Sequence, residues 1–260
     1  MPQVRAAASG NIMATLSGYA CRDATTRQVK TELARLWPHV GRFRMRLLQS
    51  GRVLGEEETP FDEKEGREPV VECLFVPKRL PTGQEVDMLI RACGTLNSMA
   101  LEMLLMKGIY PNFVVRDQRH RLHNILSVAV TKESAQQFGG LGRLHFPVLT
   151  EMLLEAHGNV NLAGSLGRTP LFVAAELGFE RAVSLLLKHR ANPDAKEEMQ
   201  GECPIHVAAR GKHAEVVRLL VDAAADVGVR RMNDGFTHGE DARELAKQVG
   251  AADVIALLSG

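Results

Sequence analysis

Hydrophobic residues follow two different patterns along the chain. From about residue 86 onward, Leu- and Ala-rich stretches alternate with turns that contain Gly, Asn or Pro, which predicts a series of short helices. Before residue 76 the pattern predicts four strands, at 4–8, 12–16, 46–49 and 70–76. A helix is expected between the second and third strands, because Thr25 can cap it and Val29, Leu33 and Leu36 share one face. The chain therefore combines an α+β part with an all-α part.

The two patterns meet in the segment 76–83, which reads Val-Pro-Lys-Arg-Leu-Pro-Thr-Gly. Two prolines and a glycine close together interrupt both strand and helix. We therefore predict a first domain at 1–76, a linker at 77–85 and a second domain at 86–260.

The second part contains an internal repeat. The sequence Arg-Thr-Pro-Leu-Phe-Val-Ala-Ala at 168–175 returns as Glu-Cys-Pro-Ile-His-Val-Ala-Ala at 202–209, and Pro170 and Pro204 are 34 residues apart. The Leu-rich helices that follow return at the same spacing. This pattern resembles the ankyrin repeat, whose signature is T-P-L-H-x-A and whose period is about 33 residues. The resemblance implies pairs of short helices that must stack on one another to bury their apolar faces.

Further copies are weaker. A first repeat is expected around 89–112, a second with its inner helix within 120–132 and its outer helix at 149–161, and a terminal one at 243–258. The second carries an insertion at 133–145, which contains three glycines and is predicted to form a long loop. The predicted solenoid thus has about five repeats.

The first part resembles a ubiquitin-like β-grasp domain. Its segment 46–54, Arg-Leu-Leu-Gln-Ser-Gly-Arg-Val-Leu, is similar to the R-L-I-F-x-G-K-x-L segment of that family, and an acidic loop and a final strand follow at the ubiquitin spacing. The resemblance implies that Val71 and Cys73 face the core, whereas Leu48 and Leu74 lie on the exposed sheet face that such domains use for binding. Since Pro77 follows where a Gly-Gly tail would end, conjugation is not expected and the domain is an integral module.

Charge and composition narrow the function classes. The 32 Lys and Arg nearly balance the 31 Asp and Glu, so the net charge of +1 provides no overall field for nucleic acid or anionic lipid. No apolar run approaches the roughly 18 residues of a membrane span. The four cysteines are far apart and form no CxxC pair, as expected for reduced thiols. We expect a monomeric cytoplasmic protein, with the nucleus as an alternative, that binds neither nucleic acid nor membrane.

Candidate chemistry is sparse. The pair His120 and His123 lacks the further ligands of a structural zinc site and is interpreted as a degenerate ankyrin motif. Cys203 has His206 three residues later, but it occupies the Thr position of the repeat. By resemblance, His206 is expected to brace neighbouring repeats through hydrogen bonds. No metal, cofactor or catalytic residue is predicted, and an enzyme with a site near Cys203 or the Gly-rich insertion remains an alternative.

Recognition is the function that the repeats imply. The leading hypothesis is a non-catalytic adaptor whose ankyrin surface captures a client protein while the ubiquitin-like module engages ubiquitin receptors or the proteasome. A second hypothesis is an ankyrin scaffold with a purely structural β-grasp domain. The resemblance implies these ligand-facing residues in the array: Leu166, Arg168, Val173, Glu176, Met199, Gln200, Arg210, Arg230, Arg231 and Met232.

Overall fold

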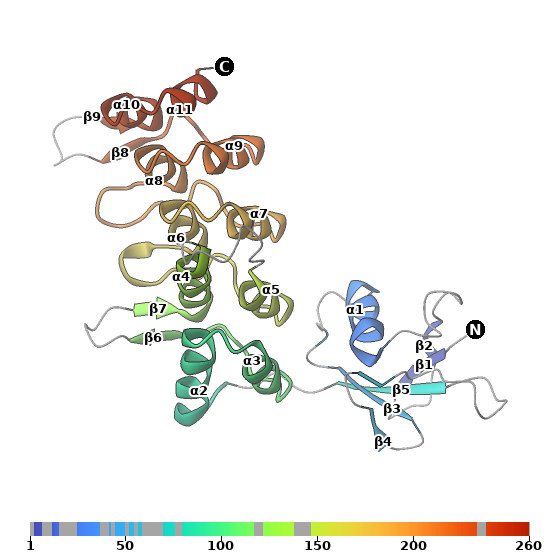
Figure 1. The fold of residues 1–260 in the computed structure, drawn as a ribbon. Coiled ribbons are helices and arrows are strands. Elements are labelled where there is room, and N and C mark those ends of the chain that lie inside the picture. Colours follow the sequence, from blue (N-terminus) through green and yellow to red (C-terminus); the bar gives the residue numbers. More distant parts are fainter. Residues whose placement is uncertain are drawn as a thin grey trace. The chain divides into compact units, whose positions relative to one another are not determined.

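The fold is seen in a computed structural model, which describes residues 3–6, 12–15, 25–36, 42, 45–49, 52–54, 57–58, 70–75, 80–116, 122–137, 147–232 and 238–259. The N-terminal part contains a mixed five-stranded sheet in the order β2-β1-β5-β3-β4 (Figure 1). Its strands are β1 (Gln3–Ala6), β2 (Ile12–Thr15), β3 (Met45–Gln49), β4 (Arg52–Val53) and β5 (Val70–Phe75). The four predicted strands are therefore present, and only β1 and β5 pair in parallel.

Helix α1 (Thr26–Leu36) packs on this sheet through the predicted apolar face. Thr25 begins it as expected, because its hydroxyl oxygen accepts a hydrogen bond from the Gln28 N–H. Val29 and Leu33 of α1, together with Leu47 of β3, are buried. A helix face with this spacing and a strand with alternating buried positions thus form one small core.

The helical array begins earlier than predicted. Helix α2 (Gly83–Gly94) starts inside the expected linker, because Thr82 and Glu85 form a capping box in which each side chain accepts the other's backbone N–H. The pattern Thr-x-x-Glu at 82–85 is the sequence signature of such a helix start, and it follows directly after Pro81.

Five helix pairs follow one another in the described residues (Figure 1). The inner helices form one row and are α2, α4 (Ile125–Gln137), α6 (Pro170–Glu176), α8 (Pro204–Arg210) and α10 (Ala242–Gln248). Their outer partners are α3 (Ser98–Leu105), α5 (Val148–Glu155), α7 (Glu180–Lys188), α9 (Ala214–Asp222) and α11 (Ala252–Leu257). The number of pairs agrees with the five repeats expected.

The core of the array lies between successive pairs. The first turns of α6 and α8 use Pro170 and Pro204, whose missing N–H costs no hydrogen bond at that position. Ala174 and Ala175 of α6 are completely buried, as are their equivalents in α8, so small side chains allow close approach of neighbouring inner helices. Leu186 supplies apolar volume on the outer side and is also completely buried.

The second repeat departs from the predicted register. Its motif is not at His120–His123: the residue that caps α4 is Asn124, whose side-chain oxygen accepts the Ser127 N–H at 2.6 Å. The motif shifts because the strands β6 (Val114–Arg116) and β7 (Leu122–Asn124) form a longer hairpin than the loops of repeats 3 and 4. A second longer hairpin, between β8 (Arg230–Met232) and β9 (His238–Asp241), precedes α10.

The predicted insertion loop at 133–145 is helical at its start, because α4 continues to Gln137. The three glycines of the insertion lie outside the described residues. Glu133, a buried residue of α4, accepts hydrogen bonds from the backbone N–H groups of Leu149 and Thr150 at 2.6 and 3.3 Å. It therefore satisfies free N–H groups at the start of α5 and fixes the two helices of this repeat to each other.

Short polar side chains connect the loops of successive repeats. The Asn192 N–H donates to Asn161 Oδ1 at 2.8 Å, and the Asp226 N–H donates to Asp194 Oδ1 at 2.9 Å. Asn112 accepts the Asn159 N–H in the same way one repeat earlier. These bonds set the spacing of the loops independently of the helix core.

A substitution in the outer layer tests this register. Leu186→Ala removes a fully buried side chain, and we expect a loss of about 2–5 kcal/mol in the free energy of unfolding. The control is Leu187→Ala in the same helix, where the side chain is only partly buried and the loss should be smaller. Urea unfolding measures both variants, and equal stability of the wild type and Leu186→Ala would contradict the packing described.

Candidate protein-binding surface

The loops of repeats 3 to 5 carry an exposed row of large apolar side chains. Leu166, Met199 and Met232 follow at intervals of 33 residues, and their exposed fractions are 42%, 70% and 65%. They lie in corresponding loops but not at identical positions, because the 34-residue spacing that aligns Gly167 with Gly201 places Gln200 opposite Leu166. Since backbone hydrogen bonds join successive loops, these three side chains follow one another from loop to loop, and we call them the tip row.

Glycines allow the loops to stack closely. Gly167 and Gly201 have positive φ angles of 70° and 63°, and a Cβ atom on Gly167 would lie only 2.9 Å from Glu198 Cγ. The loops are also joined by backbone hydrogen bonds, from Glu198 N–H to Leu166 O at 2.8 Å and from Met232 N–H to Gln200 O at 2.6 Å. The tip row therefore rests on a rigid backbone.

A buried carboxylate supports the middle loop. Glu197 accepts hydrogen bonds from the backbone N–H groups of Gln200, Met199 and Glu202. Burial by itself raises the pKa of Glu197, but these N–H groups outweigh it and hold the pKa below its ordinary value. The ionised form thus fixes the loop that presents Met199.

Polar pairs line the inner helices beside the tip row. Arg168 donates to Glu176 at 3.4 Å, and in the next repeat the pair is reversed, because Arg210 donates to Glu202. In repeat 5 Gln248 donates to Glu240 at 3.0 Å, and Arg231 connects Glu202 with Glu240. On repeats 4 and 5 these side chains therefore satisfy one another.

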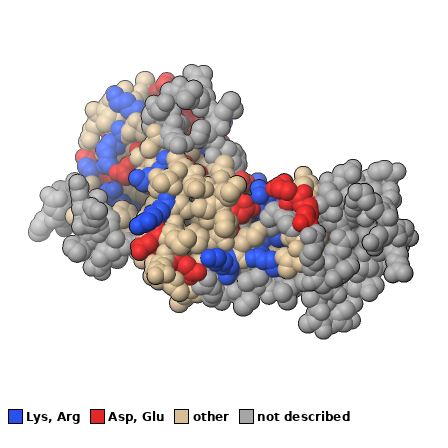
Figure 2. Space-filling model, turned by 60° about the horizontal axis from the view of Figure 1, so that its bottom comes forward, with Lys and Arg blue, Asp and Glu red and all other residues tan. Residues whose placement is uncertain are grey.

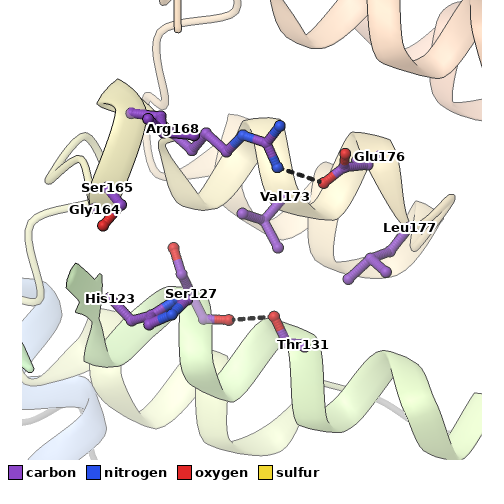
Figure 3. A pocket seen from close by; sticks show the side chains of 10 residues that line it. His123, Ser127, Thr131, Gly164, Ser165, Arg168, Val173, Glu176 and Leu177 are labelled. Carbon is purple, nitrogen blue, oxygen red and sulfur yellow. Dashed lines mark hydrogen bonds and ion pairs between the residues drawn. The ribbon is translucent and has the colours of Figure 1, made fainter. Parts of the chain in front are cut away.

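A pocket of about 210 Å³ opens between repeats 2 and 3 (Figure 3). Ser127 and Thr131 of α4 line it on one side, and Val173 of α6 and Leu177, which caps the end of α6, line it on the other. The remaining lining residues are His123, Gly164, Ser165, Leu166, Arg168 and Glu176, of which Ser165 and Leu166 belong to the short helix η2 (Ser165–Gly167). The pocket is continuous with the tip row through Leu166.

The predicted brace at His206 is confirmed. Its Nδ1 accepts the Cys203 N–H at 3.0 Å, and its Nε2 lies 2.8 Å from the Val229 carbonyl oxygen in the following loop. Burial lowers the pKa of His206, so the neutral ring is favoured. Burial also raises the pKa of the Cys203 thiol to about 11, which leaves almost no thiolate near pH 7. Cys203 is thus unsuited to act as a nucleophile.

The structure places four of the predicted array residues around one pocket and the others in the neighbouring loops and helix ends. Leu166, Arg168, Val173 and Glu176 line the pocket, Met199 and Gln200 are exposed, and Arg230 lies 3.8 Å from Glu244. The side chains of Leu48 and Leu74 lie outside the described part, although the strand register pairs their backbones with Glu72 and Arg46.

Sequence reasoning missed several residues of this surface. They are Ser127, Thr131, Glu197, Glu202 and Glu240. An alignment of Asn124 with Thr169 identifies Ser127 from the sequence, because it places Ser127 at the fourth position of the T-P-L-H motif.

The described residues carry charges of both signs in close mixture. Figure 2 shows Lys and Arg interspersed with Asp and Glu over the face in view, around an uncharged area. Within the described ranges, no group of His, Cys, Asp and Glu side chains is arranged to hold a metal ion. No described helix is long and apolar enough to cross a membrane.

Comparisons define the class of this surface. The family profile for ankyrin repeats matches residues 144–231 in three copies, so this part of the chain is an ankyrin-repeat array. Ankyrin repeat domain-containing protein 63 of Homo sapiens is 34% identical over 109 residues, 42% of this chain and 28% of that protein. Arrays of this class are protein-interaction scaffolds.

Two further relatives are much longer proteins. Potassium channel AKT2/3 of Arabidopsis thaliana is 34% identical over 110 residues, which are 42% of this chain and 13% of the channel. Rabankyrin-5 of Homo sapiens is 44% identical over 55 residues, which are 21% of this chain and 5% of that protein. The chain therefore matches only a small part of these relatives.

The pKa of His206 predicts how stability depends on pH. Because the folded pKa lies below the ordinary value of 6.5, the stabilising effect is complete above that pH and is lost as the pH falls through the folded pKa. His206→Phe, which copies Phe172 of repeat 3, removes this titration. Thermal unfolding should show a steeper fall in Tm from pH 7 to 5 for the wild type than for the variant, and parallel curves would contradict the assignment.

Proposed function

We propose that the chain is a non-catalytic adaptor whose ankyrin array binds a client protein through the tip row and the adjoining pocket. The observation that carries this proposal is the tip row itself. Three large apolar side chains are exposed at regular intervals although the surrounding core is closely packed. Exposed apolar side chains that form a contiguous set are typical of interaction sites.

The composition of the surface supports a protein ligand. Two of the three tip-row side chains are Met, and the exposed Arg230 lies in the same strand as Met232; Met and Arg are both enriched in protein interfaces. The network around Arg231 is already internally paired, so it can form a polar rim without leaving a charge unpaired on binding.

For the N-terminal part we propose a ubiquitin-like β-grasp module that engages ubiquitin receptors or the proteasome. The strand order with β1 and β5 parallel at the centre, and α1 packed on β3, supports this assignment. A cytoplasmic or nuclear site of action and a monomeric state complete the proposal. A scaffold with a purely structural first domain is the competing function.

The tip row is tested by charge. Met199→Lys combined with Met232→Lys places two cations in the row without touching the core, so the fold should remain and client proteins should be lost. Affinity capture from lysate, with bound proteins identified by mass spectrometry, measures the loss. Met88→Lys on α2, where the side chain is 53% exposed, is the matched control. Retention of the same clients by the double variant would refute the role of the row.

The ubiquitin-like module is tested separately. Leu48→Asp with Leu74→Asp, in strands β3 and β5, should abolish the retention of ubiquitin receptors or proteasome subunits while clients of the array remain. The reason is that the resemblance to ubiquitin-like domains implies that both side chains lie on the sheet face used for binding. If wild type and variant retain the same partners and none is related to ubiquitin, the first domain is structural and the scaffold function holds.

A further inference from the structure

Repeat 2 differs from repeat 4 at the fourth position of the motif. In repeat 4 this position is His206, which fills the junction with the next repeat and contacts the Val229 carbonyl. In repeat 2 the fourth position is Ser127. The equivalent carbonyl, that of Leu162, accepts a hydrogen bond from Asn124 Nδ2 at 2.5 Å instead. Because Asn124 has taken over the bracing role, Ser127 is free of it. The short Ser127 side chain leaves the space that becomes the pocket.

Two hydrogen-bonding groups of the pocket residues lack partners among the described residues. They are the buried Ser127 Oγ and the Arg168 Nε. Ser127 is only 5% exposed, and its side chain points from α4 toward α6 (Figure 3). Buried polar groups are nearly always hydrogen-bonded, so the hydroxyl beside this cavity needs a partner, which a ligand group that displaces water can supply.

The charges around Arg168 favour a neutral ligand group. Arg168 already contacts Glu176, and its charge also helps to lower the pKa of Glu197. A further carboxylate would be repelled by these two, and a cation would be repelled by Arg168. A carboxamide fits both demands, because its oxygen accepts from Ser127 or Arg168 while its NH2 group donates to Glu176.

The size and walls of the pocket agree with a single side chain. Its volume of about 210 Å³ is below the roughly 300–1,000 Å³ of pockets that enclose a whole small molecule. Leu166, Val173 and Leu177 supply apolar walls for the methylene groups that precede the amide.

We propose that the pocket between α4 and α6 binds the carboxamide side chain of a Gln or Asn residue of the client protein. This rests on the proposed function, since the client supplies the side chain. It adds a chemical specificity that the tip row alone does not have, because apolar contacts do not distinguish Gln from Leu.

Side-chain NMR of the full chain tests the pocket without a known client. The probe is N-acetylglutamine amide, and the signal is the Arg168 Nε–H resonance in a ¹H–¹⁵N correlation spectrum. We expect saturable shifts with this probe and binding at least tenfold weaker with N-acetylglutamic acid amide and with N-acetylleucine amide. Equal binding of the glutamic acid compound, or no Arg168 shift with the glutamine compound, would overturn the proposal.

Ser127→Ala separates a binding role from a structural one. The variant removes a hydroxyl without a partner, so Tm should stay the same or rise, while the affinity for N-acetylglutamine amide falls about tenfold. Ser184→Ala, on the exposed side of α7, is the control and should change neither quantity. Unchanged affinity in the Ser127 variant would overturn the proposal.

The two proposals fail in different ways. If the Met199 and Met232 variant keeps every client while the glutamine probe still shifts Arg168, the proposed function is wrong and the pocket specificity stands. If clients depend on the tip row but the glutamine probe binds no better than its glutamic acid analogue, only the pocket specificity is wrong.

Discussion

Each helix pair of the array has apolar faces that it cannot cover by itself, and this constraint governs the rest of the C-terminal part. The faces are covered only when pairs stack, which demands small residues such as Ala174 and Ala175 where inner helices meet. It also demands a fixed distance between loops, which Asn161 and Asp194 provide through their bonds to the next repeat. Packing and loop spacing are thus two independent restraints on one geometry.

The same restraint is met by different residues in different repeats. The loop carbonyl of Val229 is held by the fourth motif residue, His206, whereas that of Leu162 is held by the first, Asn124. The ion pair between the ends of an inner helix is likewise reversed between Arg168–Glu176 and Glu202–Arg210. The stacked backbone requires only that each loop carbonyl has a hydrogen-bond donor, whichever side chain supplies it. When Asn124 supplies the donor, the side chain at the fourth motif position is no longer needed for stacking and is available for binding.

The proposed binding surface is therefore a consequence of what stacking leaves uncovered. The loops are fixed by Gly167, Gly201 and buried Glu197, so their apolar tips cannot fold back into the core. At the junction of repeats 2 and 3 the substitution of a short residue for a large one opens a pocket beside those tips. A surface that is rigid before binding loses little entropy when a partner docks.

The sequence by itself determined the repeated fold, because local signals such as Pro170, Pro204 and the Ala pairs act within one helical turn and recur at a constant interval. It also determined α1 and the strands around it, and it identified Leu166, Arg168, Val173 and Glu176 as residues of one surface. Only the tertiary structure decided the register of repeat 2, because the length of the hairpin between β6 and β7 is not encoded in any local motif. It also decided the pocket, since the unpaired hydroxyl of Ser127 depends on which distant groups are present at the junction and which are absent.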